Sequence, residues 1–124
     1  MNIESLGVGI DIEDIARFEK YSKDRENSFL KKVYTPTEIE YCFKSKSPAK
    51  HLAARFCAKE AVYKAFCSLG VFGLGFQDVE IVNDSSRVPS VKFLTERLKD
   101  YSCKISLSHS KDKAAASVIV VKNS

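Results

Sequence analysis

Hydrophobic and polar residues alternate at the beginning of the chain, between positions 6 and 13. One side of the alternation is aliphatic and the other consists of glycines followed by acids: Leu6, Val8, Ile10 and Ile12 against Gly7, Gly9, Asp11 and Glu13. A period of two predicts a half-buried β-strand. Glycine weakens a strand, so two glycines on one face indicate that a ligand or another backbone comes close there. The carboxylate of Asp11 ends this bare face.

Residues 13 to about 23, which follow at once, have the spacing of a helix. An apolar seam runs along one side, while Arg17, Lys20 and Lys23 share a basic side. Such a side is, on its pattern alone, more often a solvated helix face than a docking site. The sequence therefore predicts a basic helix directly after the strand.

Two more helices are predicted before the middle of the chain. Thr35-Pro36-Thr37-Glu38 is a capping box with proline at the first helical position, so a short helix begins there. A longer helix, rich in alanine, is predicted from about residue 49 to residue 69. At about 100° per residue it has two apolar stripes on nearly opposite sides. Two apolar faces indicate a helix that is buried on both sides or lies between subunits.

Four charged residues interrupt the apolar surroundings of this long helix. Glu60 and Lys64, four residues apart and therefore neighbours, lie on a flank of small residues between the stripes. Arg55 and Lys59 have the same spacing and project from a different side. Their positive charges are candidates to hold anionic groups of a ligand.

The second half of the chain contains the remaining strands. Gly70, Gly73 and Gly75 predict a loop, and strands are predicted at residues 76–82, 104–109 and 115–121, with a strand and a helix between residues 91 and 101. No repeat or linker divides the sequence. We therefore predict a single domain, residues 1–124, of the α+β class, with a mainly antiparallel sheet packed against the long buried helix.

Composition and charge exclude several classes of protein. The 124 residues are 44% hydrophobic and 29% charged, as in soluble globular proteins, and no stretch approaches the roughly 20 apolar residues of a membrane span. The segment 1–10 has no basic n-region, so we expect no export signal and a cytoplasmic protein. The four cysteines form no CxxC pair and are expected to be reduced. A net charge of +4 is too small to imply nucleic acid, but favours an acidic partner if it is clustered.

Three of the charged residues suggest metal-assisted phosphate chemistry. Asp11 and Glu60 are hard oxygen ligands that, together with phosphates of a ligand, can hold Mg²⁺. Lys64, one turn from Glu60, can stabilise or protonate a phosphate leaving group. The alternative is a surface ion pair of Glu60 and Lys64 beside a solvated Asp11. His109, alone on an apolar strand face, is equally explained as a core histidine.

The order and spacing of several segments resemble one family. GVGIDI with Arg17 six residues after Asp11, then ARFCAKEAVYKAF, FQDVEI, and SLSHS before an alanine-rich strand are together similar to the small holo-[acyl-carrier-protein] synthases, which are 4′-phosphopantetheinyl transferases. The similarity extends over nearly the whole chain. It implies that family's fold and a reaction in which a carrier-protein serine attacks the pyrophosphate of coenzyme A. The serine takes up 4′-phosphopantetheine, adenosine 3′,5′-bisphosphate is released, and fatty acid biosynthesis is supported.

The resemblance also implies roles for the candidate catalytic residues. The metal carboxylates of the family correspond to Asp11 and Glu60, with Mg²⁺ and coenzyme A bound together. The helix lysine that acts on the leaving phosphate corresponds to Lys64. Either Glu60 or a water held by the metal is a candidate to remove the serine proton.

The same resemblance implies which residues bind coenzyme A and the carrier protein. Arg55 and His109 correspond to positions that contact coenzyme A. The residue that docks the carrier protein corresponds to Arg17, and Lys20 and Lys23 would extend this basic surface toward an acidic apo acyl carrier protein. Members of the family are typically homotrimers with a site at each subunit boundary, so a homotrimer is expected.

Two segments depart from the family's usual pattern. Cys67 to Val71 replaces a GTG-type loop, and Arg87-Val88-Pro89 replaces a Gly-Lys-Pro turn; both border the nucleotide in the family, so their coenzyme A contacts stay open. Two other functions also stay open: a different Mg²⁺-dependent phosphoryl or pyrophosphate hydrolase, and a non-catalytic basic module that binds nucleic acid or an acidic protein. The placement of Glu60 and Lys64 in a mostly apolar helix argues against the module.

Overall fold

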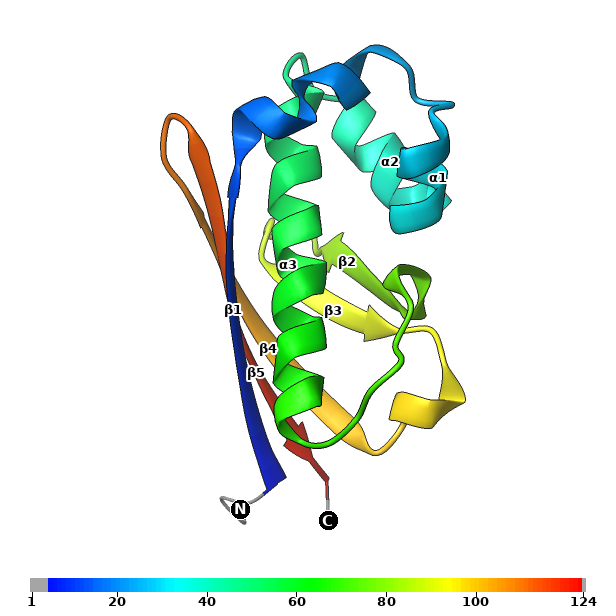
Figure 1. The fold of residues 1–124 in the computed structure, drawn as a ribbon, viewed down its shortest axis with the longest axis vertical. Helices are drawn as coiled ribbons and strands as arrows, with labels where there is room; N and C mark the ends of the chain where they lie inside the picture. Colours follow the sequence, from blue (N-terminus) through cyan, green and yellow to red (C-terminus); the bar gives the residue numbers. More distant parts are fainter. Residues whose placement is uncertain (1–4, 124) are drawn as a thin grey trace.

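A computed structural model describes residues 5–123 of the chain (Figure 1). The first four residues belong to the segment in which we expect no export signal, and they lie outside the described residues. The elements, in chain order, are β1 (Leu6–Asp14), η2 (Ile15–Lys23), α1 (Ser28–Val33), α2 (Pro36–Phe43), α3 (Pro48–Ser68), η3 (Phe76–Asp78), β2 (Val79–Asn83), β3 (Pro89–Phe93), η4 (Glu96–Leu98), β4 (Tyr101–His109) and β5 (Lys113–Lys122); the η elements are 3₁₀ helices.

The strands form two antiparallel sheets. Three strands are ordered β1-β5-β4, and β2 pairs with β3 in a separate ribbon. Figure 1 shows α3 along one face of the three-stranded sheet, with the β2-β3 ribbon, α1 and α2 on the other side of the helix. The predicted α+β class with antiparallel pairing around a long helix is confirmed, although the strands divide into two sheets.

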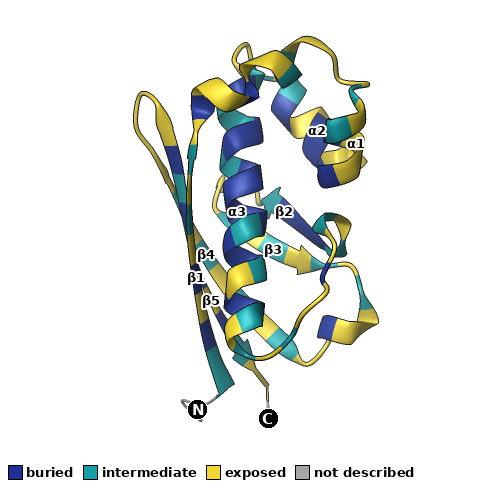
Figure 2. Ribbon diagram, viewed as in Figure 1, coloured by how far each residue is buried: buried dark blue, intermediate teal, exposed yellow. Residues whose placement is uncertain are grey.

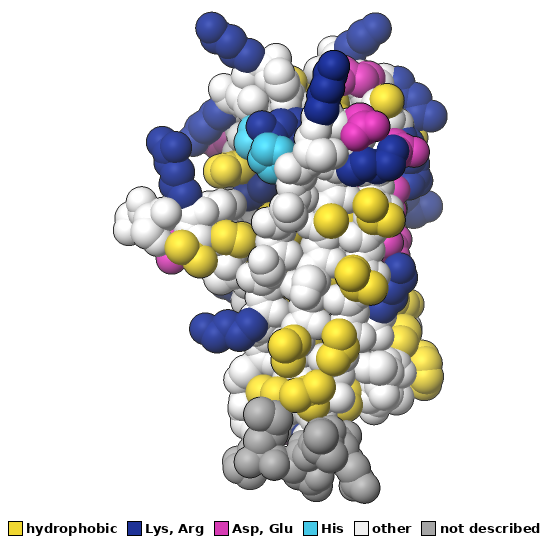
Figure 3. All heavy atoms as spheres, turned by 90° about the vertical axis from the view of Figure 1, so that its left-hand side faces the viewer, with side chains coloured by type: hydrophobic (Ala, Val, Ile, Leu, Met, Phe, Trp, Pro, Cys, Tyr) yellow, Lys and Arg dark blue, Asp and Glu magenta, His cyan; other side chains and the backbone are white. Residues whose placement is uncertain are grey.

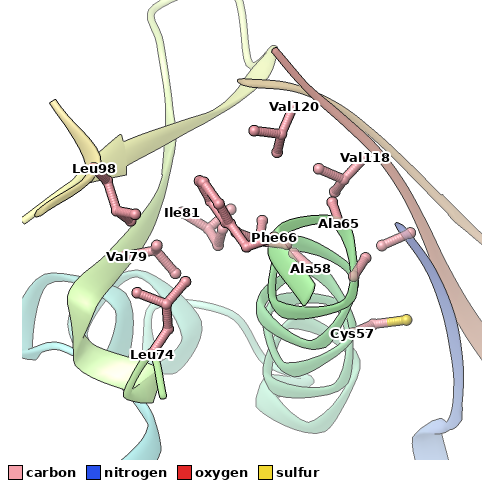
Figure 4. Close-up of a cluster of buried hydrophobic side chains, with 13 residues drawn as sticks. Cys57, Ala58, Ala65, Phe66, Leu74, Val79, Ile81, Leu98, Val118 and Val120 are labelled. Carbon is pink, nitrogen blue, oxygen red and sulfur yellow. The ribbon is translucent and has the colours of Figure 1, made fainter. Parts of the chain in front are cut away.

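Helix α3 is buried on both sides within this single chain (Figure 2). One cluster of buried side chains fills the space between α3, β5 and β2. Figure 4 shows Phe66 reaching from α3 into this space, between Ile81 of β2 and Val120 of β5. A second cluster joins α3 to η2, α1 and α2. Burial of one such large apolar side chain stabilises the fold by about 1.5–3 kcal/mol. The helix has two apolar stripes because each of its two sides is buried in one of these clusters.

In β1 the glycine face is buried and the aliphatic face is exposed, the reverse of what the hydrophobicity of the two faces suggests. The aliphatic side chains of Val8, Ile10 and Ile12 are 57%, 68% and 63% exposed, whereas Gly7 and Gly9 are buried against α3. Figure 3 shows hydrophobic side chains spread over the outer face of the sheet. The predicted strand is confirmed, and of the two occupants expected at its glycine face, another backbone is the one that the structure shows.

Several predicted elements differ in type or extent. The helix expected from residue 13 is the 3₁₀ helix η2, and Glu13 and Asp14 still belong to β1. The strand expected at 76–82 begins as η3, because the Asp78 carboxylate accepts a hydrogen bond from Gly75 N at 2.7 Å and closes a turn. The short helix α1 has no counterpart among the predictions; Asn27 caps it by accepting from Phe29 N at 2.8 Å.

Three other expectations can be compared with the structure. Both hydrogen bonds of the predicted capping box at Thr35 and Glu38 are present. All four cysteines are free thiols. Among the helices of residues 5–123, none has both the length and the apolar character needed to cross a membrane.

Candidate functional site

A close approach of β1 to α3 positions the first group of functional residues. A Cβ atom on Gly9 would lie 1.8 Å from the carbonyl oxygen of Ala61, and one on Gly7 would lie 2.3 Å from that of Ala65. Such contacts with backbone are impossible, so only glycine fits at both positions. The glycines therefore let the strand lie directly on the helix, and they bring Asp11 against it.

Charged side chains gather where β1 passes α3, in a group that we call the acidic edge. It consists of three carboxylates and two cations: Asp11, Glu13, Glu60, Arg17 and Lys64. Lys64 Nζ donates to Asp11 Oδ1 at 3.1 Å and to the Ile10 carbonyl at 3.0 Å. Arg17 Nη1 donates to Glu13 Oε1 at 2.7 Å. Lys64 is thus paired with Asp11, so the alternative of a Glu60–Lys64 pair beside a solvated Asp11 is wrong.

The carboxylates of the acidic edge crowd negative charge around Asp11. Burial and the Asp11 charge raise the pKa of Glu60, and burial and the neighbouring Asp11 carboxylate raise the pKa of Glu13. Burial, followed by the Asp11 charge, raises the pKa of the nearby Cys57 thiol to about 12. The hydrogen bond to Asp11 raises the pKa of Lys64. Each of these shifts opposes further negative charge here, so a bound cation would relieve the site.

One carboxylate oxygen at the acidic edge lacks a partner. Asp11 Oδ2 is buried and makes no hydrogen bond, although buried polar atoms ordinarily have one. Within residues 5–123, no three acid, histidine or cysteine side chains form a complete metal cluster. Mg²⁺ commonly takes one or two carboxylates and completes its shell with substrate phosphates and water. The oxygen donors of Asp11 and Glu60 therefore fit Mg²⁺ in company with a phosphate ligand.

A cleft of about 470 Å³ opens between α3, β4 and the turn that joins β2 to β3, and we call it the basic cleft. Five of its lining side chains carry or can carry positive charge: Lys50, His51, Arg55, Arg87 and His109. None of the lining residues, all of them described in the structure, is an aspartate or a glutamate. Figure 3 shows histidine beside Lys and Arg side chains on this side of the molecule. The charge of the cleft suits an anionic ligand.

Arg55 lies at the bottom of the basic cleft. Its side chain lies over the Tyr41 ring, 3.8 Å from the centroid, and Nη2 donates to Asn83 Oδ1 at 2.5 Å. The residue is only 3% exposed, and its Nε has no hydrogen-bond partner. Burial and then the charges of Arg55, Lys50 and His109 lower the pKa of His51. Positive charge is therefore uncompensated in the cleft.

The acidic edge and the basic cleft lie apart within one chain. Asp11 is on β1 and His109 is on β4, and β5 separates these strands. On α3, Arg55 and Glu60 are five residues apart, which is roughly 140° around the helix. No residue of the acidic edge lines the cleft. The structure thus brings Asp11, Glu60 and Lys64 together, and separately Arg55 and His109.

The interpretation of Lys59 as a ligand-binding residue is wrong. Its side chain is buried, and Nζ donates to the carbonyls of Val33, Phe76 and Val79 at 2.9, 2.7 and 3.1 Å. It also lies 2.7 Å from Glu38 Oε1. An ammonium has three protons, so none is left for a ligand. Lys59 holds α3 to the surrounding loops, and Glu38 does more than cap its helix.

The basic residues of η2 share one side of that helix. Side chains three residues apart eclipse one another in a 3₁₀ helix, which aligns Arg17, Lys20 and Lys23. Arg17 also lies 5.1 Å from the centroid of the Phe56 ring and is bound by Glu13. This row of basic side chains is therefore fixed at Arg17, beside the acidic edge.

Sequence reasoning missed several residues of both regions. Glu13 follows Asp11 by two positions, so the period-two pattern could have placed it beside Asp11. The basic cleft is also lined by Asn83, Arg87 and His51. These residues come from the end of β2, the turn after it and α3, and no sequence pattern connects them. Only the packing of the β2-β3 ribbon beside β4 brings them together.

Comparison with known proteins agrees with this architecture. A family model described as the 4′-phosphopantetheinyl transferase superfamily matches residues 7–119. The chain therefore belongs to this superfamily. Within it, the holo-[acyl-carrier-protein] synthase of Syntrophus aciditrophicus (strain SB) is 41% identical over 121 residues, which cover 92% of this chain and 94% of that protein. The synthase of Geobacter sp. (strain M21) is 38% identical over 92% of this chain and 96% of that protein.

Solved structures show the same similarity. The Helicobacter pylori holo-[acyl-carrier-protein] synthase, determined in complex with coenzyme A, has a TM-score of 0.78 and 34% identity, covering 91% of this chain and 98% of that one. The Mycobacterium tuberculosis acyl carrier protein synthase has a TM-score of 0.75 and 34% identity, over 94% and 96% of the two chains.

Proposed function

We propose that this chain transfers 4′-phosphopantetheine from coenzyme A to a serine of an apo acyl carrier protein and releases adenosine 3′,5′-bisphosphate. The observation that carries the proposal is the pairing of Asp11 with Lys64 beside Glu60, at the place where β1 lies on α3. Membership of the superfamily and the names of the relatives support this reaction. We further propose that it serves fatty acid biosynthesis in the cytoplasm.

Asp11 and Glu60 would hold the metal ion of this reaction. The unpartnered Asp11 Oδ2 and the raised pKa of Glu60 support this assignment, because one oxygen of Asp11 is left free and the Glu60 carboxylate is disfavoured by burial and by the Asp11 charge. Bound Mg²⁺ would supply charge neutralisation at the pyrophosphate of coenzyme A. Asp11 also holds Lys64 in place, since the Lys64 ammonium donates to Asp11 and to the Ile10 carbonyl of β1.

Lys64 is the group that we assign to the leaving phosphate. In the transfer, the serine oxygen bonds to the phosphorus that carries pantetheine, and the bond from that phosphorus to the bridging oxygen breaks. The bridging oxygen leaves with adenosine 3′,5′-bisphosphate and gains negative charge. An ammonium near this oxygen stabilises the charge or donates a proton to it. Lys64 is exposed on one side, and its hydrogen bond to Asp11 raises its pKa, which further favours the ammonium form.

The basic cleft would receive the nucleotide end of coenzyme A. Arg55 and His109 line it, as the assigned role requires, and no acid opposes them. The relative from Helicobacter pylori was solved with coenzyme A, which supports a coenzyme A site in this fold. Lys59 takes no part, because its protons are used within the protein.

A homotrimer would bring the two regions together. The acidic edge and the basic cleft lie at opposite edges of the sheet, so a neighbouring copy can place its cleft beside the acidic edge of the first. Three aliphatic side chains of β1 are exposed on the outer face of that sheet, which favours self-association. Sedimentation velocity tests this: a trimer is expected, dissociated by Ile10→Lys, and a wild-type monomer would contradict it.

Arg17, Lys20 and Lys23 would dock the acidic carrier protein next to the acidic edge. Their alignment on η2, directly after β1, supports a single continuous contact surface. Attraction of this kind acts mainly on the rate of association and weakens with salt.

Mass spectrometry of an apo acyl carrier protein tests the proposed function. With the chain, coenzyme A and Mg²⁺, the carrier should gain one phosphopantetheinyl group per molecule, with adenosine 3′,5′-bisphosphate formed in equal amount. Release of free 4′-phosphopantetheine without a modified carrier would instead identify a hydrolase, and no reaction at all would contradict both.

A further inference from the structure

The turn between β2 and β3 contains a residue in an unusual backbone conformation. Arg87 has a φ of 67° and is the only non-glycine residue within residues 5–123 with a positive φ. This left-handed region is unfavourable for any residue with a Cβ atom, and glycine adopts it freely. A residue held there is often functional. Glycine at this position would relieve the strain, but it has no side chain. An arginine held here therefore indicates that its side chain has a role.

The turn is built without the guanidinium of Arg87. Asp84 Oδ1 accepts hydrogen bonds from Ser86 N at 2.8 Å and from Val88 N at 3.1 Å, and Arg87 N donates to the Asp84 carbonyl at 2.9 Å. In the part of the chain that the structure describes, no protein group accepts a hydrogen bond from the Arg87 guanidinium or forms an ion pair with it. The turn therefore fixes the backbone of Arg87 and leaves its charge available.

A single amide connects this turn to the buried arginine of the cleft. Asn83 Nδ2 donates to the Arg87 carbonyl at 3.1 Å, while Asn83 Oδ1 accepts from Arg55 Nη2 at 2.5 Å. Arg55 and Arg87 both line the basic cleft, one buried and one exposed at its rim. Asn83 thus supports the guanidinium of Arg55 and the backbone of Arg87 in one cleft.

The charge of the cleft indicates which part of the substrate it receives. Coenzyme A has two anionic parts: the pyrophosphate, which reacts, and the phosphate monoester on the ribose 3′-oxygen. The reacting pyrophosphate belongs with Asp11 and Glu60 at the acidic edge, so the monoester is the anion left for the cleft. A monoester carries a charge between about −1.5 and −2 at neutral pH, and arginine binds such a group through two parallel hydrogen bonds.

We propose that Arg87 recognises the ribose 3′-phosphate of coenzyme A and makes the chain select coenzyme A over 3′-dephospho-coenzyme A. This inference rests on the proposed function, because that function supplies the substrate. Arg87 acts from the rim of the cleft, and the turn of Asp84 holds it there before the ligand arrives.

Nucleotide binding tests the inference without any transfer reaction. Isothermal titration calorimetry compares adenosine 3′,5′-bisphosphate with adenosine 5′-monophosphate, using the wild type, Arg87→Gln and Arg87→Gly. Both variants should lose about tenfold in affinity for the bisphosphate, the loss expected for hydrogen bonds to a charged group, and none for the monophosphate. Lys92→Gln removes an exposed charge from the same β2-β3 ribbon outside the cleft and should change neither affinity. Equal losses for both nucleotides, or no loss, would overturn the inference.

Steady-state kinetics and stability complete the test. Arg87→Gln should raise the KM for coenzyme A about tenfold while leaving kcat and the kinetics with 3′-dephospho-coenzyme A unchanged, so the preference between the substrates falls by the same factor. Arg87→Gly should unfold at a higher temperature than the wild type, because glycine relieves the strained φ. An active Arg87→Gln enzyme with unchanged preference would overturn the inference and leave the proposed function intact. If no carrier is modified but the nucleotide preference still depends on Arg87, the proposed function alone fails.

Discussion

The acidic edge and the basic cleft are built from the same helix in opposite ways. At the acidic edge, two glycines of β1 let a strand lie on α3, and burial together with the Asp11 charge raises the pKa of Glu60. In the basic cleft, cations line an open hollow without any acid, and the pKa of His51 is lowered. Each region has an excess of one charge. The difference shows that each region carries uncompensated charge. A metal ion at the acidic edge and a phosphate in the basic cleft would compensate it.

Loss of Lys59 should have the largest effect, because this buried residue ties α3, the helix that both regions share, to the surrounding loops. Lys59→Met leaves Glu38 buried without its cation, and breaking a buried ion pair destabilises a protein by about 3–5 kcal/mol. Urea unfolding measures the free energy of unfolding. Lys64→Met on the same helix is the control, since the pair of Lys64 with Asp11 is half exposed on the lysine side and should contribute less than about 1 kcal/mol. Equal destabilisation by the two variants would refute this assignment of Lys59.

Glu60→Gln should separate the two regions most clearly. The change removes a charge at the acidic edge, so kcat should fall by about 100-fold to 1,000-fold, the loss typical for one electrostatic group of an active site. The affinity of the basic cleft for adenosine 3′,5′-bisphosphate without Mg²⁺ should stay the same by calorimetry. Asp112→Asn, in the β4-β5 hairpin, is a matched control and should retain full activity. If the nucleotide affinity falls together with kcat, the two regions are not separate.

A change in the cleft should show the opposite kinetic pattern. His109→Ala removes a hydrogen-bond donor to a phosphate, worth about 1.5 kcal/mol, so the KM for coenzyme A should rise about tenfold at nearly constant kcat. Ser102→Ala on the same strand, outside the cleft, serves as the control. A drop in kcat with unchanged KM would instead place His109 at the reacting atoms.

The smallest effect concerns the stability of the acidic edge and its pH dependence. The pKa of Glu60 is raised in the folded chain, so its contribution to stability is fully present below the unfolded pKa and is lost as the pH rises through the folded pKa. Glu60→Gln, which stays neutral, should therefore have a higher Tm than the wild type at neutral pH. The difference in Tm between the variant and the wild type should vanish as the pH falls to about 4, below the ordinary glutamate pKa. Calorimetric scans at both pH values measure the two Tm values. A Glu60→Gln variant that is less stable than the wild type at neutral pH would contradict this prediction.

Elements with strong local signals could be predicted from the sequence. The capping box at Thr35, the long alanine-rich helix and the strand that carries Asp11 are all present. Each of these elements depends on neighbours within a few residues, or on a periodicity that the element displays alone. The grouping of Asp11 with Glu60 and Lys64, which lie on different elements, came instead from the chemistry of the side chains and from the family resemblance.

Features that depend on tertiary packing could not be predicted. The glycine face of β1 is the buried one because the backbone of α3 occupies the space of a side chain, and no periodicity reports such an approach. Lys59 looked like a partner of Arg55 on the helix wheel, but carbonyls from three distant residues and Glu38 surround it. The composition of η2 likewise does not distinguish a 3₁₀ helix from an α-helix, and two of its residues, Ile15 and Phe18, pack in the cluster that includes α3.

Mixing two impaired variants, assayed with coenzyme A well below the KM of the cleft variant, tests most directly whether the acidic edge of one copy works with the basic cleft of another. Glu60→Gln and Arg55→Met, each verified as folded, are co-expressed with different tags, and mixed assemblies that carry both tags are purified. If the site lies at subunit boundaries, some boundaries contain an intact Glu60 and an intact Arg55 from different copies. Transfer activity should then return to about one third of the wild-type level, because every cyclic trimer that contains both variants has one such boundary out of three. Activity no higher than that of the separate variants would contradict the account and place both regions of one site in a single chain.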